Sequence, residues 1–166
     1  LPDGWDQTSV VCSDQSDSDE IDLQAGEDVT CVFTNTQRGK IIVDKVTEPS
    51  GDQTSFMVTA SGTGVIYGSE STLVSDSQNG EFEVAPGSYS VSEEPEAGWK
   101  ETANTCDDLT ISAGETEECT ITNTQLTDIY VVKQTNPSPD DTSTFFSFEG
   151  QMTGSVVDGA GLGDLE

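Results

Sequence analysis

Hydrophobic residues in this chain alternate with polar ones over short stretches, which is the pattern of half-buried β-strands. β-Branched and aromatic residues dominate these stretches, and turn dipeptides such as Asn79-Gly80 and Pro86-Gly87 separate them. The strands predicted in the middle of the chain are 40–47, 55–60, 71–75, 81–85, 88–93, 108–112 and 117–123. No stretch has helical periodicity. Seven short strands predict an all-β fold, an antiparallel β-sandwich of the immunoglobulin-like type.

The chain also repeats itself. Each copy contains a Gly-Trp pair, two cysteines and the sequence Thr-Asn-Thr-Gln in the same order. The matched pairs are 4–12 with 98–106, offset by 94 residues, and 25–37 with 113–125 and 39–49 with 127–137, both offset by 88 residues. A unit of about 88–94 residues has the length of one small domain. The sequence therefore predicts tandem sandwich domains.

The repeat divides the chain unevenly. Residues 39–125 hold one complete unit. Residues 1–38 correspond to the C-terminal part of a preceding unit, and residues 126–166 correspond to the N-terminal part of a following one. Because residue 1 is Leu rather than Met, we expect the chain either to be a piece of a longer precursor or to have been processed. The incomplete ends either belong to a tandem array or complete each other between molecules.

The charge of the chain excludes several classes of partner. Among 166 residues there are 32 Asp and Glu, 5 Lys and Arg, and no His, which gives a net charge of −27. Such a surface repels phosphate and anionic lipid, so we expect no nucleic-acid partner. No apolar run approaches the roughly 20 residues of a membrane-spanning helix, so we expect no membrane insertion. Without His, the Ser-His-Asp and Cys-His nucleophiles are impossible, and carboxylate pairs are too common here to indicate a glycosidase.

The four cysteines predict disulfides and an extracellular or cell-surface location. Of the three possible pairings, the repeat favours Cys12–Cys31 and Cys106–Cys119, one bridge per unit. A loop of this size contributes about 3 kcal/mol on the chain-entropy estimate. In the second unit, the strands 108–112 and 117–123 are expected to form a hairpin whose open end the disulfide closes. Metal thiolates are disfavoured because no CxxC occurs.

Three polar side chains fall on the apolar faces of their strands: Lys45, Glu93 and Asn123. The partial units repeat the pattern with Lys133 and Asn35. A buried ammonium is costly unless it is paired or discharged. Burial lowers the pKa of a lysine, and a protonated carboxyl can polarise a carboxamide. The neutral amine can then attack the amide carbon, release ammonia and leave a Lys–Asn isopeptide bond.

The segments GKIIVDK, PGSYSVSEEPEAGW and CTITNTQ resemble the Cna B-type or SpaA-like domains of prokaryotic surface pilins and adhesins. The resemblance covers 39–125 and both flanks, and it implies a prealbumin-like β-sandwich. In many such domains an autocatalytic isopeptide bond forms. Carried over by position, the resemblance implies Lys45 as nucleophile, Asn123 as electrophile and Glu93 as catalytic acid.

The same resemblance implies that Lys133 and Asn35 are the cross-link partners contributed by incomplete units. Glu94 adjoins Glu93 and offers a second candidate for the acid. The alternative interpretation is non-covalent: Lys45 extends to the end of the sheet and forms an ion pair with Glu93.

An acidic loop in the first partial unit suggests a cation. Asp14, Asp17, Asp19 and Glu20 lie in the segment SDQSDSDE, and Ca²⁺ binds six to eight oxygens of this kind. The spacing is not that of an EF-hand, because the fixed Gly and the closing Glu are absent. A calcium site is one interpretation of this loop, and a solvated acidic loop is the other.

These features together predict a structural repeat module of an extracellular fibre, pilus or large surface protein. Its partners would be copies of itself or further repeats of the same chain. The alternative is a ligand-binding or calcium-dependent adhesin module, which calls for an exposed apolar or aromatic patch that the sequence does not single out. Apart from autocatalytic bond formation, we expect no enzymatic activity.

Overall fold

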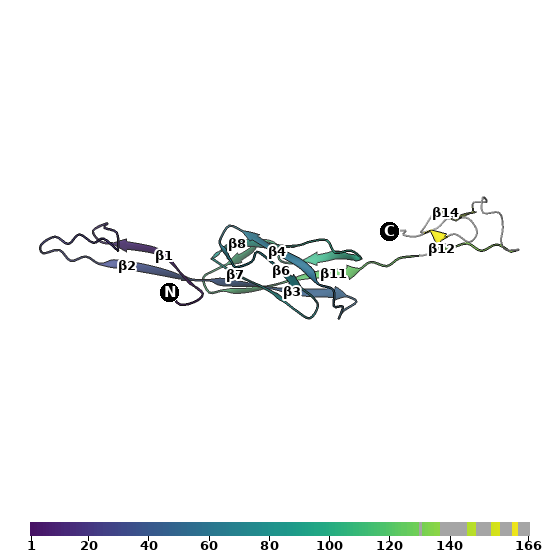
Figure 1. Cartoon of the computed structure of the whole chain (residues 1–166), viewed down its shortest axis with the longest axis horizontal. Coiled ribbons are helices and arrows are strands. Elements are labelled where there is room, and N and C mark those ends of the chain that lie inside the picture. The colour runs from purple at the N-terminus through teal and green to yellow at the C-terminus, as the bar shows by residue number, and fades with distance from the viewer. Residues whose placement is uncertain (130, 137–145, 149–153, 157–160, 163–166) are drawn as a thin grey trace. The chain divides into compact units, whose positions relative to one another are not determined.

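The computed structural model (Figure 1) describes residues 1–129, 131–136, 146–148, 154–156 and 161–162. The chain divides into two compact units, Leu1–Gln125 and Leu126–Glu166. The strands of the first unit are β1 (Trp5–Cys12), β2 (Cys31–Gln37), β3 (Gly39–Glu48), β4 (Phe56–Gly62), β5 (Ile66–Tyr67), β6 (Ser71–Val74), β7 (Gly80–Val84), β8 (Gly87–Glu93), β9 (Trp99–Asn104), β10 (Leu109–Ile111) and β11 (Thr116–Gln125). Within the described residues there is no helix, and hence none that could cross a membrane.

Strands β3 to β11 form a sandwich of two sheets. One sheet has the order β10-β8-β4-β6 and the other the order β5-β7-β3-β11-β9. The predicted all-β sandwich is confirmed, with two differences. Strands β5 and β9 are not among the seven predicted strands. The neighbouring strands β3 and β11 run parallel, whereas the other pairs are antiparallel. Strands β3 and β11, the first and last strands of the sandwich, are therefore direct neighbours within one sheet.

The core lies between the two sheets and follows the alternation of the strands. In β3, buried residues alternate with more exposed ones along the whole strand. The buried apolar cluster comprises Ile41, Val43, Phe56, Val58, Ala60, Val74, Phe82, Val84, Tyr89, Val91, Cys106, Leu109, Ile111, Cys119 and Ile121. The low overall hydrophobic content is sufficient for this fold because these residues come from both inner faces.

Tyr89 fixes the strand that carries Glu93. Its ring is almost fully buried, and its hydroxyl donates to the carbonyl oxygen of Ala85 at 2.6 Å. The ring passes close to Gly64, where a Cβ atom would collide with the Tyr89 hydroxyl. The buried phenol is therefore satisfied, and β8 is anchored against the loop before it.

One predicted pairing is wrong. The segment before Gly114 forms β10, which pairs with β8, while β11 pairs with β3 and β9 in the other sheet. Gly114 does make a turn, with a φ of +73°, but the turn leads from one sheet to the other. The sequence locates the turn correctly, but long-range pairing decides the partners, so β10 and β11 do not form a hairpin.

The N-terminal strands β1 and β2 form a separate two-stranded antiparallel sheet, from Trp5 opposite Gln37 to Cys12 opposite Cys31. We call this element the N-terminal hairpin. Its second strand is largely uncovered: Phe33 is 55% exposed, and Asn35 is also exposed. The inward face that the sequence predicts for this strand is thus not covered by another sheet.

A single residue, Arg38, separates β2 from β3 and joins the hairpin to the sandwich. Its guanidinium donates to both carboxylate oxygens of Asp6, at 2.9 and 2.7 Å, and to Glu83 at 3.2 Å. It also lies 3.6 Å from the ring centroid of Tyr67, whose hydroxyl donates to Asp6 at 2.5 Å. The bidentate ion pair and the stacked ring make this junction a specific contact.

The described part of the second unit contains β12 (Val131–Val132), β13 (Phe146–Phe148), β14 (Gly154–Val156) and β15 (Gly161–Leu162). Strand β12 pairs with β15, and β13 pairs with β14, both antiparallel. The remainder of the predicted partial repeat lies outside the described residues.

Candidate functional site

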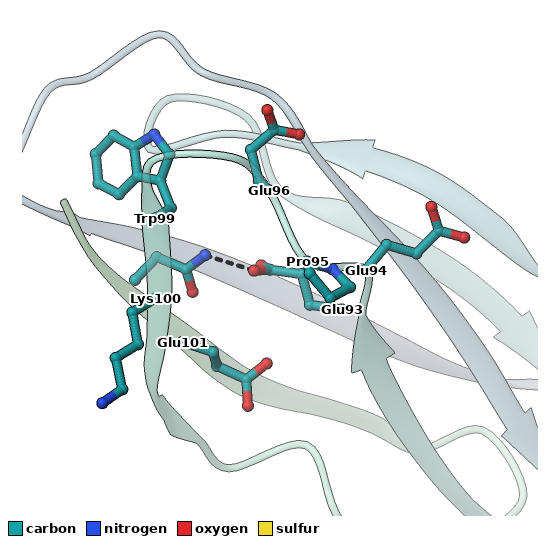
Figure 2. A pocket seen from close by; sticks show the side chains of 8 residues that line it. Glu93, Glu94, Pro95, Glu96, Trp99, Lys100 and Glu101 are labelled. Carbon is teal, nitrogen blue, oxygen red and sulfur yellow. Dashed lines mark hydrogen bonds between the residues drawn. The ribbon is translucent and has the colours of Figure 1, made fainter. Parts of the chain in front are cut away.

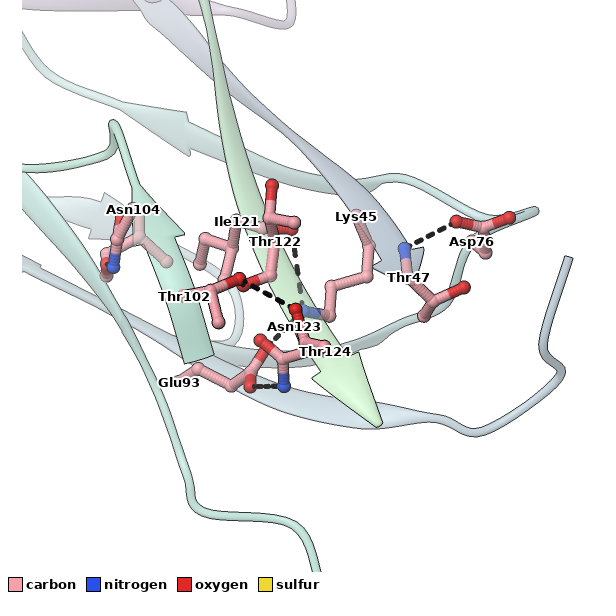
Figure 3. Close-up of polar contacts among 11 residues, drawn as sticks. Lys45, Thr47, Asp76, Glu93, Thr102, Asn104, Ile121, Thr122, Asn123 and Thr124 are labelled. Atoms are coloured by element: carbon pink, nitrogen blue, oxygen red, sulfur yellow. Dashed lines mark hydrogen bonds and ion pairs between the residues drawn. The ribbon is translucent and has the colours of Figure 1, made fainter. Parts of the chain in front are cut away.

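Three polar residues meet between the sheets at one end of the sandwich (Figure 3). Lys45 comes from β3 and Asn123 from the neighbouring parallel strand β11, while Glu93 ends β8 in the opposite sheet. In the register of the parallel pair, Lys45 is opposite Ile121 and Asn123 is opposite Thr47, so the two side chains are staggered by two residues. Alternation turns both of them toward Glu93.

The carboxylate of Glu93 contacts both partners. Its Oε2 lies 2.9 Å from Lys45 Nζ, and its Oε1 accepts a 2.5 Å hydrogen bond from Asn123 Nδ2. Lys45 Nζ also donates to the carbonyl oxygen of Ile121 at 3.4 Å. A single carboxylate thus holds the amine and the amide together.

The site is dry. Lys45 and Asn123 are each 1% exposed, and the side chain of Glu93 is 3% exposed. The ammonium lies 4.2 Å from the ring centroid of Phe56, which in turn packs edge-on against Trp99 at 5.5 Å. Buried charges are tolerated when they are paired, and here the ion pair and the aromatic ring supply the compensation.

Burial changes the protonation of the lysine. It lowers the pKa of Lys45 below its usual value of 10.5, and the neighbouring Glu93 carboxylate partly opposes the shift. A lowered pKa raises the fraction of neutral amine, which is the nucleophilic form. The site therefore favours amine chemistry more than an exposed lysine would.

Two buried oxygens at this end of the sandwich have neither a hydrogen bond nor an ion pair among the described residues, Asn123 Oδ1 and Thr47 Oγ1. Asn123 Oδ1 is buried and has no hydrogen-bond partner among the described residues. Leaving a buried carbonyl unpaired costs free energy, so such an atom in a folded protein calls for an explanation. Its carbon is the atom that a neutral Lys45 would attack. The arrangement fits both interpretations of the sequence, a buried ion pair and the precursor of an isopeptide bond.

The supporting residues were not found from the sequence. Asp76, which follows β6, accepts hydrogen bonds from the backbone N–H groups of Thr47 and Gly51 at 2.7 and 2.6 Å. These bonds fix the end of β3 just beyond Lys45, and they lower the pKa of Asp76. An Asp among the loop residues of an acidic chain carries no distinguishing signal, so only the structure could identify it.

The structure separates the two candidate acids. Glu93 points between the sheets, whereas Glu94 is exposed and only its backbone N–H is engaged, by the carbonyl of Met57 at 2.9 Å. Alternation along β8 explains the difference, since adjacent residues face opposite sides. The geometry therefore supports Glu93 over Glu94.

The predicted partners from the incomplete units lie in different compact units of the chain, Asn35 in the first and Lys133 in the second. Asn35 is exposed on β2. Lys133, in the second unit, donates to the carbonyl oxygen of Gln134 at 2.6 Å and lies 4.3 Å from the ring centroid of Phe146. A cross-link through Lys133 and Asn35 stays a prediction.

The acidic loop does not converge on a cation position. Nowhere in the described part of the chain do three or more acidic, Cys or His side chains gather as metal ligands, and this part includes Asp14, Asp17, Asp19 and Glu20. Asp14 instead accepts hydrogen bonds from the backbone and hydroxyl of Ser16. The calcium interpretation stays a prediction without geometric support.

Both predicted disulfides are present and no free cysteine remains. Cys12 is joined to Cys31 in the hairpin, and Cys106 to Cys119 in the sandwich. Cys106 lies in the loop after β9 and Cys119 in β11. The pairing inferred from the repeat is therefore confirmed.

Comparison with known proteins agrees with this architecture. A family model described as a prealbumin-like fold domain of the SpaA type matches residues 39–130, more than half of the chain. Among solved structures, the major pilin protein of Streptococcus pyogenes matches with 18% identity and a TM-score of 0.31 over 57% of this chain. The match spans 48% of that pilin, about half of its length. A comparison with curated proteins found no match. The chain belongs to the SpaA-type family of prealbumin-like fold domains.

Proposed function

We propose that this chain is a structural module of an extracellular surface fibre or pilus, strengthened by a Lys45–Asn123 isopeptide bond. The observation that carries the proposal is the buried arrangement in which Glu93 contacts both Lys45 Nζ and Asn123 Nδ2. The fold family and the two disulfides support the surface location, because disulfides persist in oxidising compartments. The acidic surface keeps neighbouring shafts soluble, and no substrate is turned over.

Bond formation uses only groups already in the site. The Lys45 ammonium passes a proton to Glu93, and the neutral Nζ attacks Cγ of Asn123. The bond between Cγ and Nδ2 breaks as Glu93 transfers a proton to Nδ2, which leaves as ammonia. The new bond joins Nζ to Cγ. After the attack Nζ carries one proton too many, which the Glu93 carboxylate takes up once it has protonated Nδ2, and this second Lys45 proton leaves with ammonia as ammonium. The dry surroundings favour the neutral amine throughout.

The position of the bond explains its value to a fibre. Lys45 lies in the first strand of the sandwich and Asn123 in the last, and these strands are neighbours in one sheet. A pull on the two ends of the unit would pass directly from β3 to β11 through the covalent bond. The rest of the sandwich would not need to resist the load.

Intact mass of the reduced chain tests the proposal. The wild-type chain is expected to weigh one ammonia less than its sequence, and a digest should contain a branched peptide joining Lys45 to Asn123. Glu93→Gln keeps the size of the side chain but cannot shuttle the proton, so it should have the full mass. The exposed neighbour provides the matched control, and Glu94→Gln should lose ammonia like the wild type. A full-mass wild-type chain would eliminate the bond.

We further propose that the N-terminal hairpin is the C-terminal hairpin of another sandwich unit. It would be completed by a strand of the type that contains Lys133, either in a tandem array or in a second molecule. Support comes from the uncovered face of β2, where Asn35 occupies the position that Asn123 occupies in β11. In the completed unit, Lys133 of one unit would face Asn35 of another.

Denaturing electrophoresis of the reduced chain after concentration tests completion between molecules. Covalent oligomers are expected in the wild type and should be absent in Lys133→Met. Asn123→Ala, which removes only the intradomain acceptor, should leave the oligomers in place. Monomer alone at every concentration would exclude cross-linking between molecules.

A further inference from the structure

A cavity of about 250 Å³ opens beside the buried site. Figure 2 shows Glu93, Glu101 and Trp99 around it, and Glu94 and Glu96 on its rim. The buried Asn123 also contributes to its wall. Four carboxylates and one indole thus line a single hollow at the end of the sandwich.

The cavity wall has an acceptor without a donor. Asn123 Oδ1 is unpartnered, and the residue is 1% exposed. The ionised carboxylates around it are also acceptors and cannot satisfy it. A group that enters the cavity and donates a hydrogen bond would remove the cost of this unpaired carbonyl.

Acidic residues outnumber basic residues around the cavity. Burial and, after it, the nearby Glu93 raise the pKa of Glu101 above its usual value. Lys45 is already paired with Glu93, and Lys100 is the one basic residue among those that line the cavity. A cation would relieve the repulsion between the carboxylates.

Trp99 favours an organic cation. Its ring is held in place by the edge-on contact with Phe56, and indole attracts cations more strongly than other aromatic side chains do. Among the described residues no three acidic, Cys or His side chains are arranged as metal ligands, so the same carboxylates do not form a site for a metal ion.

We propose that this cavity binds a primary ammonium group, such as that of a small amine or of a lysine side chain on another protein. The three N–H donors of the ammonium group match Asn123 Oδ1 and the carboxylates of Glu93 and Glu101, and its charge faces the indole of Trp99. The site does not depend on the isopeptide bond, because the carbonyl oxygen of Asn123 remains when that bond forms.

Fluorescence of the full chain tests this site. In a Trp5→Phe background Trp99 is the remaining tryptophan, and methylammonium chloride should shift its emission saturably. Sodium chloride at equal concentration controls for screening of the acidic surface. Tetramethylammonium controls for the donors, because it has the charge but no N–H group. Trp99→Phe leaves Trp5, which is not among the residues that line the cavity, and its emission should not respond.

Two variants locate the site. Glu101→Gln should weaken methylammonium binding about fivefold, in line with one partly exposed charge pair. Glu118→Gln removes an exposed charge from β11 outside the cavity and should change nothing. Movement of the side-chain amide signal of Asn123 in NMR spectra gives a second measurement that does not rely on Trp99.

The source of the amine is decided by a second titration with Nα-acetyl-lysine methylamide and its Nζ-acetylated form. Binding of the first alone supports a lysine side chain as ligand, and binding of methylammonium alone supports a small amine. An equal response to sodium or tetramethylammonium, or no effect of Glu101→Gln, would overturn the proposal.

Discussion

Two regions of this chain have similar sequences and the same local structure, but they differ in what packs around them. The N-terminal hairpin, β1 and β2, corresponds to β9 and β11 of the sandwich. Both pairs carry a disulfide and an irregularity at the same place, next to Thr8 in the hairpin and Thr102 in the sandwich. In both, that threonine hydroxyl lies within hydrogen-bond distance of a threonine hydroxyl on the partner strand, at 2.9 and 3.2 Å.

The difference between them is burial. Ile121 in β11 is fully buried, whereas Phe33 at the matching place in β2 is 55% exposed. Strand β11 has β3 along one edge and the second sheet over its face, while β2 pairs with β1 alone. Local sequence is thus sufficient for the strand pair, its irregularity and its disulfide, but burial of the apolar face requires other strands.

The largest difference between the two regions is expected at the matched apolar position, which is Ile121 in β11 and Phe33 in β2. Ile121→Ala should lower the free energy of unfolding of the sandwich by about 3 kcal/mol, because it leaves a cavity in the core. Phe33→Ala removes a larger side chain but should change this free energy of unfolding by less than about 0.5 kcal/mol, because the Phe33 side chain is exposed. Denaturant unfolding, followed through Trp99 in a Trp5→Phe background, measures both. Equal costs would mean that the hairpin face is covered in solution.

The two disulfides test the same difference between the N-terminal hairpin and the sandwich. Replacing Cys106 and Cys119 by Ala should destabilise the sandwich by about 3 kcal/mol, through the added entropy of the unfolded chain and the loss of two buried side chains. Replacing Cys12 and Cys31 should leave the sandwich transition within about 0.5 kcal/mol, since that bridge closes a loop outside it. Calorimetry of the two double variants compares them directly. A large loss from the hairpin bridge would show that the two regions unfold as one.

The smallest effect concerns the junction. Arg38 lowers the pKa of Asp6 from 3.8 to about 2 in the folded chain. The ion pair therefore stabilises the junction above a pH of about 3.8, and this contribution is lost as the pH falls toward 2. NMR signals of the Arg38 side chain should titrate in this window. Asp6→Asn should abolish the titration, and an unchanged titration in that variant would show that Asp6 is not its origin.

The sequence located much of the site because alternation is a local property. Lys45, Glu93 and Asn123 were identified as inward residues from their apolar neighbours, and the structure brings the three together. The same rule assigns Asn35 as an inward residue, but its side chain is exposed because no second sheet lies over β2 in the described part of the chain. A rule that predicts a face cannot predict whether anything packs on it.

Other features could not be predicted from local patterns. The parallel pairing of β3 with β11 joins strands far apart in the chain. The expected hairpin of β10 and β11 does not form, because each of these strands also pairs with a strand distant in sequence. Asp76 supports the end of β3 from a loop, and the role of such a residue depends on a distant backbone. The acidic loop that suggested calcium showed the right residue types, but their side chains do not converge.

The sequence by itself determined most of the strands, the two faces of each of them and the disulfide pairing, because period-two alternation and the internal repeat are properties of the sequence alone. The tertiary structure decided which strands became neighbours and which faces were buried. Pairing and burial depend on contacts between segments distant in sequence. For that reason only the folded sandwich could place Glu93 from one sheet between Lys45 and Asn123 of the other.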